Sequence, residues 1–207
     1  MSEYKDYGYK SNKGACAHSY LAGSLLRMLN KGKNKTLLDV GCGNGSMASF
    51  LIENGYTVYG TDASVTGIEQ ARKTHANRFF VQDLTKDELP SELSAINFDT
   101  IISTEVVEHL YDPRKYIAFC KNVLEKNGGG ELILSTPYHG YLKNLVMAAS
   151  GTLDNHFTAL WDGGHIKFWS RKTLTQLLTE QGFKVTEFKG SGRIPYLWKS
   201  MFIKAII

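Results

Sequence analysis

The sequence predicts an α/β fold in which helices cover both faces of a mostly parallel sheet. Three observations predict it. Short aliphatic runs typical of buried strands alternate with longer segments of helical periodicity. Glycine or an Asp-Pro pair marks several of the boundaries between them. The 207 residues suffice for one three-layer sandwich with its own core, so residues 1–207 are expected to form a single domain.

The periodicity places each element in order. A helix is expected at about 17–30, where Leu21, Leu25 and Met28 share one face. The first three strands are expected at 36–40, 57–60 and 78–81, separated by helices that end near 54 and cover about 65–75. A fourth strand is expected at 98–103, a helix at 113–125 and a fifth strand at 131–136. A last helix between Ser170 and Gly182 precedes strands at about 184–188 and 198–206.

Composition narrows the classes of function. The net charge is +4, from 24 basic and 20 acidic residues, and the basic run at 31–35 is interpreted as a solvated loop, so no nucleic-acid partner is expected. No apolar run reaches the roughly 20 residues that a membrane-spanning helix needs. Three scattered cysteines favour a reducing compartment. A cytoplasmic location is therefore expected, and the sequence leaves the oligomeric state open.

Two segments stand outside the alternation. Residues 1–35 are interpreted as a polar lead-in followed by a helix. Residues 137–169 form a long connection that is helical in part around 142–149. It is expected to lie over the face of the sheet that binds the substrate. Its aromatic residues Tyr138, Phe157, Trp161 and Trp169 are candidate pocket walls, with core packing an equal alternative for each.

Ligands of parallel sheets bind at the carboxyl ends of the strands, which makes the glycine loop after the first strand informative. Glycines there allow a sharp turn and a close approach to a ligand. Asp62 follows Gly41 by 21 residues, a position from which a carboxylate accepts the hydroxyls of an adenosine ribose. Asp83, after the third strand, is a candidate for an adenine amino group. The candidate loop residues are Asp39, Gly41, Cys42, Gly43, Asn44 and Gly45.

A nicotinamide or flavin enzyme is the alternative class that this loop must be tested against. Its fingerprint is G-x-G-x-x-G, whereas this loop has the spacing G-x-G-x-G with Ser46 at the place of the last glycine. The tighter loop favours a ligand without a pyrophosphate.

The stretch Leu37-Leu38-Asp39-Val40-Gly41-Cys42-Gly43-Asn44-Gly45 resembles the first motif of the class I S-adenosylmethionine-dependent methyltransferases. Asp62 and Asp83 stand where that family binds ribose and adenine, and the strands at 101–105 and 132–137 resemble its fourth and fifth. The resemblance covers about residues 36–188. It implies a Rossmann-like, seven-stranded sheet with an antiparallel last strand. It also implies S-adenosylmethionine as cofactor, with Ala63, Leu84, Thr104 and Glu105 as further contacts.

Glu105-Val106-Val107-Glu108-His109 forms a second cluster. Helical spacing would place Glu105, Glu108 and His109 on one face, and two carboxylates with an imidazole suit Mg²⁺, Mn²⁺ or Zn²⁺. His165 is a candidate fourth ligand. The pattern resembles the ubiquinone-biosynthesis O-methyltransferases, which share the following Asp112-Pro113. It also resembles the small-RNA 2′-O-methyltransferases, in which these positions hold a metal.

The same residues allow a reading without metal. Glu105 then closes the cofactor pocket, Glu108 is a solvated acid, and His109 or His165 is the general base. We expect methyl transfer to an oxygen of a small-molecule acceptor. Two alternatives remain open: a metal-dependent RNA 2′-O-methyltransferase, and a cofactor-binding module without catalysis. A nicotinamide oxidoreductase is a more distant third.

Overall fold

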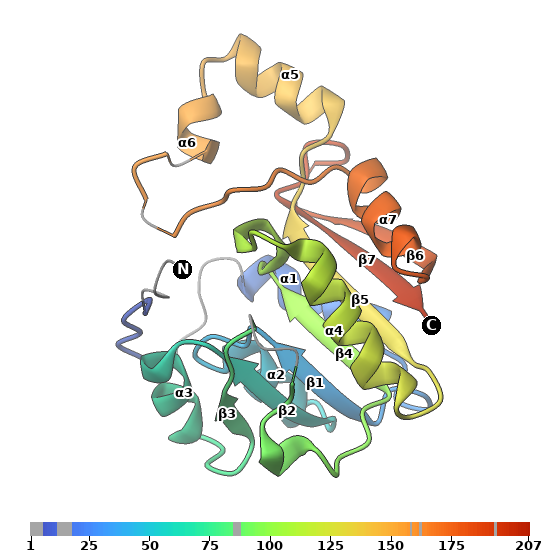
Figure 1. Cartoon of the computed structure of the whole chain (residues 1–207). Helices are drawn as coiled ribbons and strands as arrows, with labels where there is room; N and C mark the ends of the chain where they lie inside the picture. The colour runs from blue at the N-terminus through green and yellow to red at the C-terminus, as the bar shows by residue number, and fades with distance from the viewer. Residues whose placement is uncertain (1–5, 12–17, 85–87, 158, 162, 193) are drawn as a thin grey trace.

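The computed structural model describes residues 6–11, 18–84, 88–157, 159–161, 163–192 and 194–207. The described strands form one seven-stranded sheet with the order β3-β2-β1-β4-β5-β7-β6 (Figure 1). The strands are β1 Thr36–Val40, β2 Thr57–Asp62, β3 Phe79–Val81, β4 Thr100–Thr104, β5 Glu131–Pro137, β6 Lys184–Ser191 and β7 Ser200–Ile206. β7 runs antiparallel to its neighbours β5 and β6, and the other pairs are parallel. The predicted Rossmann-like sheet with an antiparallel last strand is confirmed.

Helices cover both faces of this sheet. The helices are α1 His18–Met28, α2 Ser46–Glu53, α3 Val65–Arg72, α4 Pro113–Glu125, α5 Tyr141–Ala149, α6 Leu153–Phe157 and α7 Arg171–Glu180, with short 3₁₀ turns η1 Ser91–Leu93 and η2 Val107–His109. Apolar residues of α1, α2 and α3 form one core cluster with the sheet, and those of α4 and α7 form another on the opposite face.

Successive residues of the central strands belong to different cores. Leu37 packs in the cluster of α1 to α3, and Leu38 packs in the cluster of α4 and α7. Ile101 and Ile102 divide in the same way. Because side chains alternate across a strand, a strand covered on both faces needs apolar residues at consecutive positions. Fully burying one such side chain contributes roughly 1.5–3 kcal/mol, which explains why the strands were legible in the sequence.

Several boundaries differ from the predicted ones. β2 continues to Asp62 because Gly60, Thr61 and Asp62 pair with β3. The helix expected at 65–75 ends at Arg72. β6 continues to Ser191, since its antiparallel pairing with β7 extends as far as Ser200. The first residue of the expected 17–30 helix lies outside the described residues.

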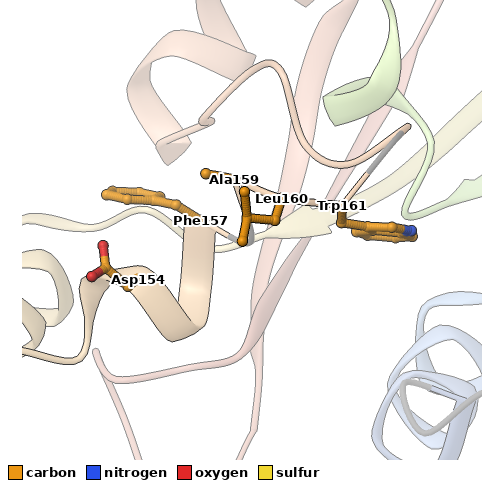
Figure 2. A pocket seen from close by; sticks show the side chains of 5 residues that line it. All are labelled: Asp154, Phe157, Ala159, Leu160 and Trp161. Atoms are coloured by element: carbon orange, nitrogen blue, oxygen red, sulfur yellow. The ribbon is translucent and has the colours of Figure 1, made fainter.

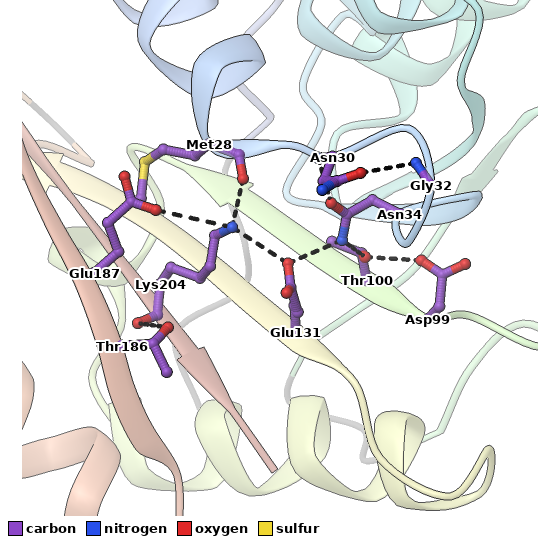
Figure 3. A network of polar contacts seen from close by, with 10 residues as sticks. All are labelled: Met28, Asn30, Gly32, Asn34, Asp99, Thr100, Glu131, Thr186, Glu187 and Lys204. Carbon is purple, nitrogen blue, oxygen red and sulfur yellow. Dashed lines mark hydrogen bonds and ion pairs between the residues drawn. The ribbon is translucent and has the colours of Figure 1, made fainter.

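The loop between α1 and β1 is not the fully solvated loop that its lysines indicated. Asn34 is 2% exposed. Its amide nitrogen donates to Thr100 Oγ1 (2.7 Å) and to Glu131 Oε2 (2.9 Å) (Figure 3). Lys204 of β7 also pairs with Glu131 (3.4 Å) and donates to the carbonyl of Met28 at the end of α1. This network ties α1, β4, β5 and β7 together.

The segment between β5 and α7 carries α5 and α6 away from the sheet (Figure 1). The helix predicted around 142–149 is confirmed as α5, and α6 is an addition to the prediction. Lys143 of α5 is 8% exposed and donates to the carbonyl of Lys199 (3.3 Å). Among the residues that the structure describes, no helix has the length and apolarity to cross a bilayer.

Candidate active site

The glycine loop connects β1 to α2. The backbone amides of Gly41 and Cys42 both donate to the carbonyl of Thr61, at 2.8 and 3.0 Å. Gly41 and Gly45 have φ angles of 78° and 73°, a region that side chains with a Cβ rarely adopt. A Cβ on Gly41 would lie 2.4 Å from the side chain of Val106, so the loop packs directly against the segment that follows β4.

Asp62, at the end of β2, braces this loop. Its two carboxylate oxygens accept hydrogen bonds from the amides of Gly43 and Ser64, each at 2.7 Å. Burial is the largest effect on its pKa and raises it, while the two amides oppose that rise. A carboxylate has about four lone-pair directions, so Asp62 can still accept two hydroxyl groups.

Asp39 lies beneath the loop with no exposed surface. Neither carboxylate oxygen has a hydrogen-bond partner among the described residues. Burial, followed by the charge of Asp62, raises the pKa of Asp39 to about 8. A buried carboxylate of this kind favours a neighbouring cation or a bound proton.

The remaining cofactor candidates lie along the same edge. Ala63 directly follows β2 and Thr104 is the last residue of β4, and both are half-buried. Asp83 is exposed after β3, and the half-buried Leu84 packs against the core. Cys42, Gly43 and Asn44 are buried within the glycine loop.

Glu105 does not share a helical face with Glu108 and His109. Only residues 107–109 form a helical turn, and Glu105 has a φ of 57° before it. Its carboxylate instead accepts from Ser135 Oγ (2.7 Å) and Ser200 Oγ (3.0 Å). Burial raises the pKa of Glu105 to about 7, against the lowering effect of these hydroxyls and of Lys143. Glu105 is therefore not part of the expected four-ligand cluster, because side chains of β5 and β7 hold its carboxylate.

The other three expected ligands do converge. Glu108, His109 and His165 each offer one ligand atom, and these atoms lie within 4.8 Å of one another. Glu108 is 1% exposed, and neither of its oxygens has a hydrogen-bond partner in the described part of the chain. Burial and then the charge of Glu105 raise its pKa well above the usual range. Sequence reasoning that made Glu108 a solvated acid was wrong, because the segment around His165 covers it.

Backbone hydrogen bonds bring His165 to this cluster. The amides of Ile166 and Lys167 both donate to the carbonyl of Glu108, at 2.9 and 3.0 Å. The Nδ1 atom of His109 bonds to the carbonyl of Gly163 at 2.9 Å, which makes Nδ1 the donor. His109 Nε2 is then the free acceptor, 3.9 Å from Glu108 Oε1. Burial lowers the pKa of both histidines, that of His165 to about 4, so both rings are neutral near pH 7.

A family model described as a methyltransferase domain matches residues 15–187. The chain belongs to this methyltransferase family. Two relatives named ubiquinone biosynthesis O-methyltransferase are similar to it. One, from Dinoroseobacter shibae, is 31% identical over 80% of this chain and 66% of its own length. The other, from Coxiella burnetii, is 33% identical over 76% of this chain and 67% of its own length. The chain thus spans about two thirds of the length of these relatives.

A solved structure supports the fold assignment of this methyltransferase chain. The magnesium protoporphyrin IX methyltransferase of Synechocystis PCC 6803, with bound SAH, superposes with a TM-score of 0.65 at 20% identity. The match covers 90% of this chain and 81% of that one. The class I resemblance that the glycine loop indicated is therefore confirmed for family and fold.

The insertion of this methyltransferase carries an open, largely apolar cavity of about 790 Å³. Figure 2 shows the residues that line it: Asp154, Phe157, Ala159, Leu160 and Trp161. Trp161 also contacts the rings of His109 and His165, at centroid distances of 5.9 and 6.0 Å. The cavity therefore borders the three-residue cluster. Tyr138 and Trp169, the other aromatic candidates, pack against the core instead.

Sequence reasoning missed one part of this edge. Residues 6–11, interpreted as part of a flexible lead-in, lie between α3 and the insertion (Figure 1). Tyr7 packs on Trp161, and Asp6 bonds to Ser64 and Thr66 at the start of α3. These contacts join residues about 60 and 150 positions apart, so no local pattern announces them.

Proposed function

We propose that this chain is an S-adenosylmethionine-dependent methyltransferase that methylates a hydroxyl oxygen of a small molecule. One observation carries the proposal: Glu108 and His109 lie on the segment that packs against the glycine loop, and His165 joins them from the insertion. A donor in the loop and an acceptor at the cluster are then neighbours.

The cofactor half of the proposal rests on two carboxylates. Asp62 is the ribose acceptor, with lone pairs left over after its two amide bonds. Asp39 supplies negative charge beneath the loop, where the ammonium group of the cofactor's amino-acid end would offset its burial. Asp83, exposed after β3, is proposed for the adenine amino group. Ala63, Leu84, Thr104 and Glu105 are proposed as the remaining walls of this pocket.

The acceptor half assigns His109 as the general base. Its Nδ1 hydrogen is held by the carbonyl of Gly163, so Nε2 presents a lone pair to an acceptor hydroxyl. Glu108 Oε1 lies 3.9 Å from this nitrogen, close enough for its carboxylate, when ionised, to stabilise the imidazolium that forms as the proton arrives. The sulfonium already carries a good leaving group, so holding the oxygen in line with the methyl supplies much of the rate.

A divalent cation at the same three side chains is the alternative to a His109 base, because an Nε2 atom that binds a metal has no lone pair left to accept the proton. Both oxygens of Glu108 and the Nδ1 atom of His165 are buried without hydrogen-bond partners in the described residues. One carboxylate with two imidazoles is a donor set that suits Mn²⁺ or Zn²⁺. A bound cation would lower the pKa of the acceptor hydroxyl at this place.

The cavity supports a small acceptor with an apolar part. Phe157, Leu160 and Trp161 line it with apolar surface, and Trp161 also contacts the ring of His109. The relatives' name, ubiquinone biosynthesis O-methyltransferase, supports oxygen as the methylated atom. An RNA acceptor and a non-catalytic module remain the alternatives that the test must separate.

The decisive experiment combines cofactor binding with turnover. Calorimetric titration with S-adenosylmethionine is expected to show saturable binding that NADH does not reproduce. Methyl transfer from labelled S-adenosylmethionine is then measured on phenols with and without an apolar tail, and on a short RNA, each with EDTA or Mn²⁺. Transfer to the tailed phenol supports the proposal. Transfer to RNA alone supports the first alternative, and binding without transfer to any acceptor supports the second.

A further inference from the structure

Residues 6–11, here called the strap, are fastened to the turn that follows Asp62. The Asp6 carboxylate accepts hydrogen bonds from Ser64 Oγ (2.7 Å), from the amide of Thr66 (3.1 Å) and from the Thr66 hydroxyl. It also accepts from the amide of Gly8 (2.8 Å), which bends the strap back on itself. The amide of Ser64 in turn donates a hydrogen bond to Asp62. One turn therefore holds both the strap and the carboxylate proposed to bind the ribose.

The strap is also fastened to the glycine loop. The amide of Tyr9 donates to Thr66 Oγ1 (3.0 Å), and Asn44 Nδ2 donates to the carbonyl of Ser11 (2.9 Å). The Tyr9 hydroxyl lies 2.7 Å from the position that a Cβ on Gly43 would take. A phenol hydroxyl thus rests directly on the loop proposed to bind the amino-acid end of the cofactor.

Tyr7 links the strap to the acceptor side. Its ring meets Trp161 edge to face at 5.6 Å and stacks on Tyr9 at 5.8 Å. Tyr7 is 45% exposed, and partial burial, followed by the charges of Glu108 and Asp62, raises its pKa to about 12. Tyr7 therefore lies close enough to Asp62 and to Glu108 for both charges to act on it, and its phenol stays protonated near pH 7.

We propose that the strap retains the cofactor and completes the roof of the acceptor site, with Asp6 as its anchor and Tyr7 as a positioning residue. This inference rests on the proposed function. In the proposed reaction, the methyl group passes from a cofactor bound beside Asp62 to an acceptor bound beside Glu108. Tyr7 contacts Trp161 on the acceptor side while its strap is held at the turn after Asp62, so the ring is placed to limit water there and to fix the acceptor against the donor.

Trp161 completes the roof from the insertion side. It contacts Tyr7, His109 and His165 within 6.0 Å between ring centroids. Tyr7 and Trp161 thus bring the strap and the insertion into contact. A ligand that orders one of them is expected to order the other.

The test measures S-adenosylhomocysteine, which needs no acceptor. Its dissociation rate is followed by stopped-flow fluorescence in the parent, Asp6→Ala, Tyr7→Ala and Tyr7→Phe proteins. Asp6→Ala is expected to release the ligand about tenfold faster, since several charge-assisted hydrogen bonds are lost. Tyr7→Ala is expected to do likewise, and Tyr7→Phe to stay within about twofold because the ring contact remains.

Hydrogen exchange supplies a readout that loss of stability alone would not produce. In the parent, S-adenosylhomocysteine is expected to slow exchange in residues 6–11 and 159–166 together. In Asp6→Ala and Tyr7→Ala the protection of 159–166 is expected to vanish, although the insertion itself is unchanged. Lys10→Ala in the strap and Glu69→Ala on α3 remove exposed charges and serve as matched controls.

The outcomes separate the two proposals. Parent-like release and parent-like protection in both alanine variants would overturn the strap and leave the proposed function intact. Failure of the parent to bind S-adenosylhomocysteine would overturn both. Tyr7 and Trp161 also form a double-mutant cycle, in which additive effects on the release rate would contradict their acting as one roof.

Discussion

At the scale of single residues, the edge of the sheet concentrates acids that lack ordinary partners. Asp39 and Glu108 are both buried without hydrogen bonds among the described residues, and burial raises the pKa of each. Such groups lower the stability of a folded chain when they ionise. Buried acids of this kind favour the binding of a cation or a proton, which neutralises their charge.

Asp39 makes this cost measurable. Its pKa is about 8 in the folded chain against an ordinary value of 3.8. Between these values the unfolded chain releases a proton that the folded chain retains, so the stability falls as pH rises through this window. Asp39→Asn removes the titration, and the fall in unfolding free energy between about pH 5 and about pH 8 should shrink by about 2 kcal/mol or more.

Urea titrations without ligand at the two pH values measure this difference. The matched control is Glu69→Gln, which replaces an exposed carboxylate on α3. An unchanged pH dependence in Asp39→Asn would show that Asp39 is ionised in the folded chain without a ligand, which would contradict a need for a cation beneath the loop.

His109 is the residue that separates binding from chemistry. Replacing it by alanine removes the Nε2 acceptor but leaves the glycine loop intact. We expect turnover to fall by roughly 10²–10⁴-fold, while the Kd for S-adenosylhomocysteine stays within about twofold. Acceptor assays and calorimetry measure the two quantities, with His75→Gln as the control outside the site. Equal turnover in both variants would remove His109 from the mechanism.

At the scale of elements, two polar anchors hold segments that the hydrophobic core does not reach. Lys143 is the buried basic residue of α5, a helix whose other face exposes Tyr141, Leu142 and Leu145. Burial lowers its pKa to about 8, and Glu105 opposes that fall. Asn34 does the same work for the loop before β1, through Thr100 and Glu131.

Loss of the Lys143 anchor should loosen α5 selectively. Lys143→Met removes the bond to the Lys199 carbonyl and the positive charge near Glu105. We expect faster hydrogen exchange in residues 141–149 and unchanged exchange in α4, with a stability loss of about 1–3 kcal/mol. Lys172→Met, an exposed lysine on α7, is the control. Uniform acceleration across both helices would contradict a local anchor.

Asn34 gives a second test at this scale. Asn34→Ala leaves Thr100 and Glu131 without its amide, and the unfolding free energy should fall by about 1–3 kcal/mol. Lys33→Ala, one residue away and exposed, should change it by less than about 0.5 kcal/mol. Urea unfolding of the three proteins measures both values, and equal stability of the two variants would contradict the network in Figure 3.

At the scale of the whole molecule, the two cores and the ligand edge are coupled through the sheet. The glycine loop begins directly after β1, and the acceptor segment begins directly after β4, its hydrogen-bonded neighbour. A ligand that binds both loops stabilises the folded chain against unfolding. At about 100-fold excess over Kd this amounts to about 2.7 kcal/mol, or an increase in Tm of roughly 5–10 °C.

Thermal unfolding with S-adenosylhomocysteine measures this shift, and NADH is the comparison ligand. Asp62→Ala should abolish the shift, because the carboxylate proposed to accept the ribose hydroxyls is gone. A comparable shift in Asp62→Ala, or a larger one with NADH, would place the cofactor elsewhere.

The sheet, the order of its elements and the family could all be predicted from the sequence. Buried parallel strands need consecutive apolar residues, and the glycine loop needs positive φ angles at fixed positions, so both leave local patterns. The closeness of Glu108 and His109 could also be predicted, since they are adjacent in the chain. The helical face that was expected to include Glu105 does not form.

Which polar groups pair with one another depends instead on the three-dimensional structure. In the folded chain, Glu105 accepts hydrogen bonds from Ser135 and Ser200. The segment around His165 covers Glu108, and Tyr7 of the strap packs on Trp161. These contacts join residues that are 30 to 150 positions apart. Their formation depends on how far each strand reaches and where each loop crosses the sheet, which side-chain periodicity does not encode.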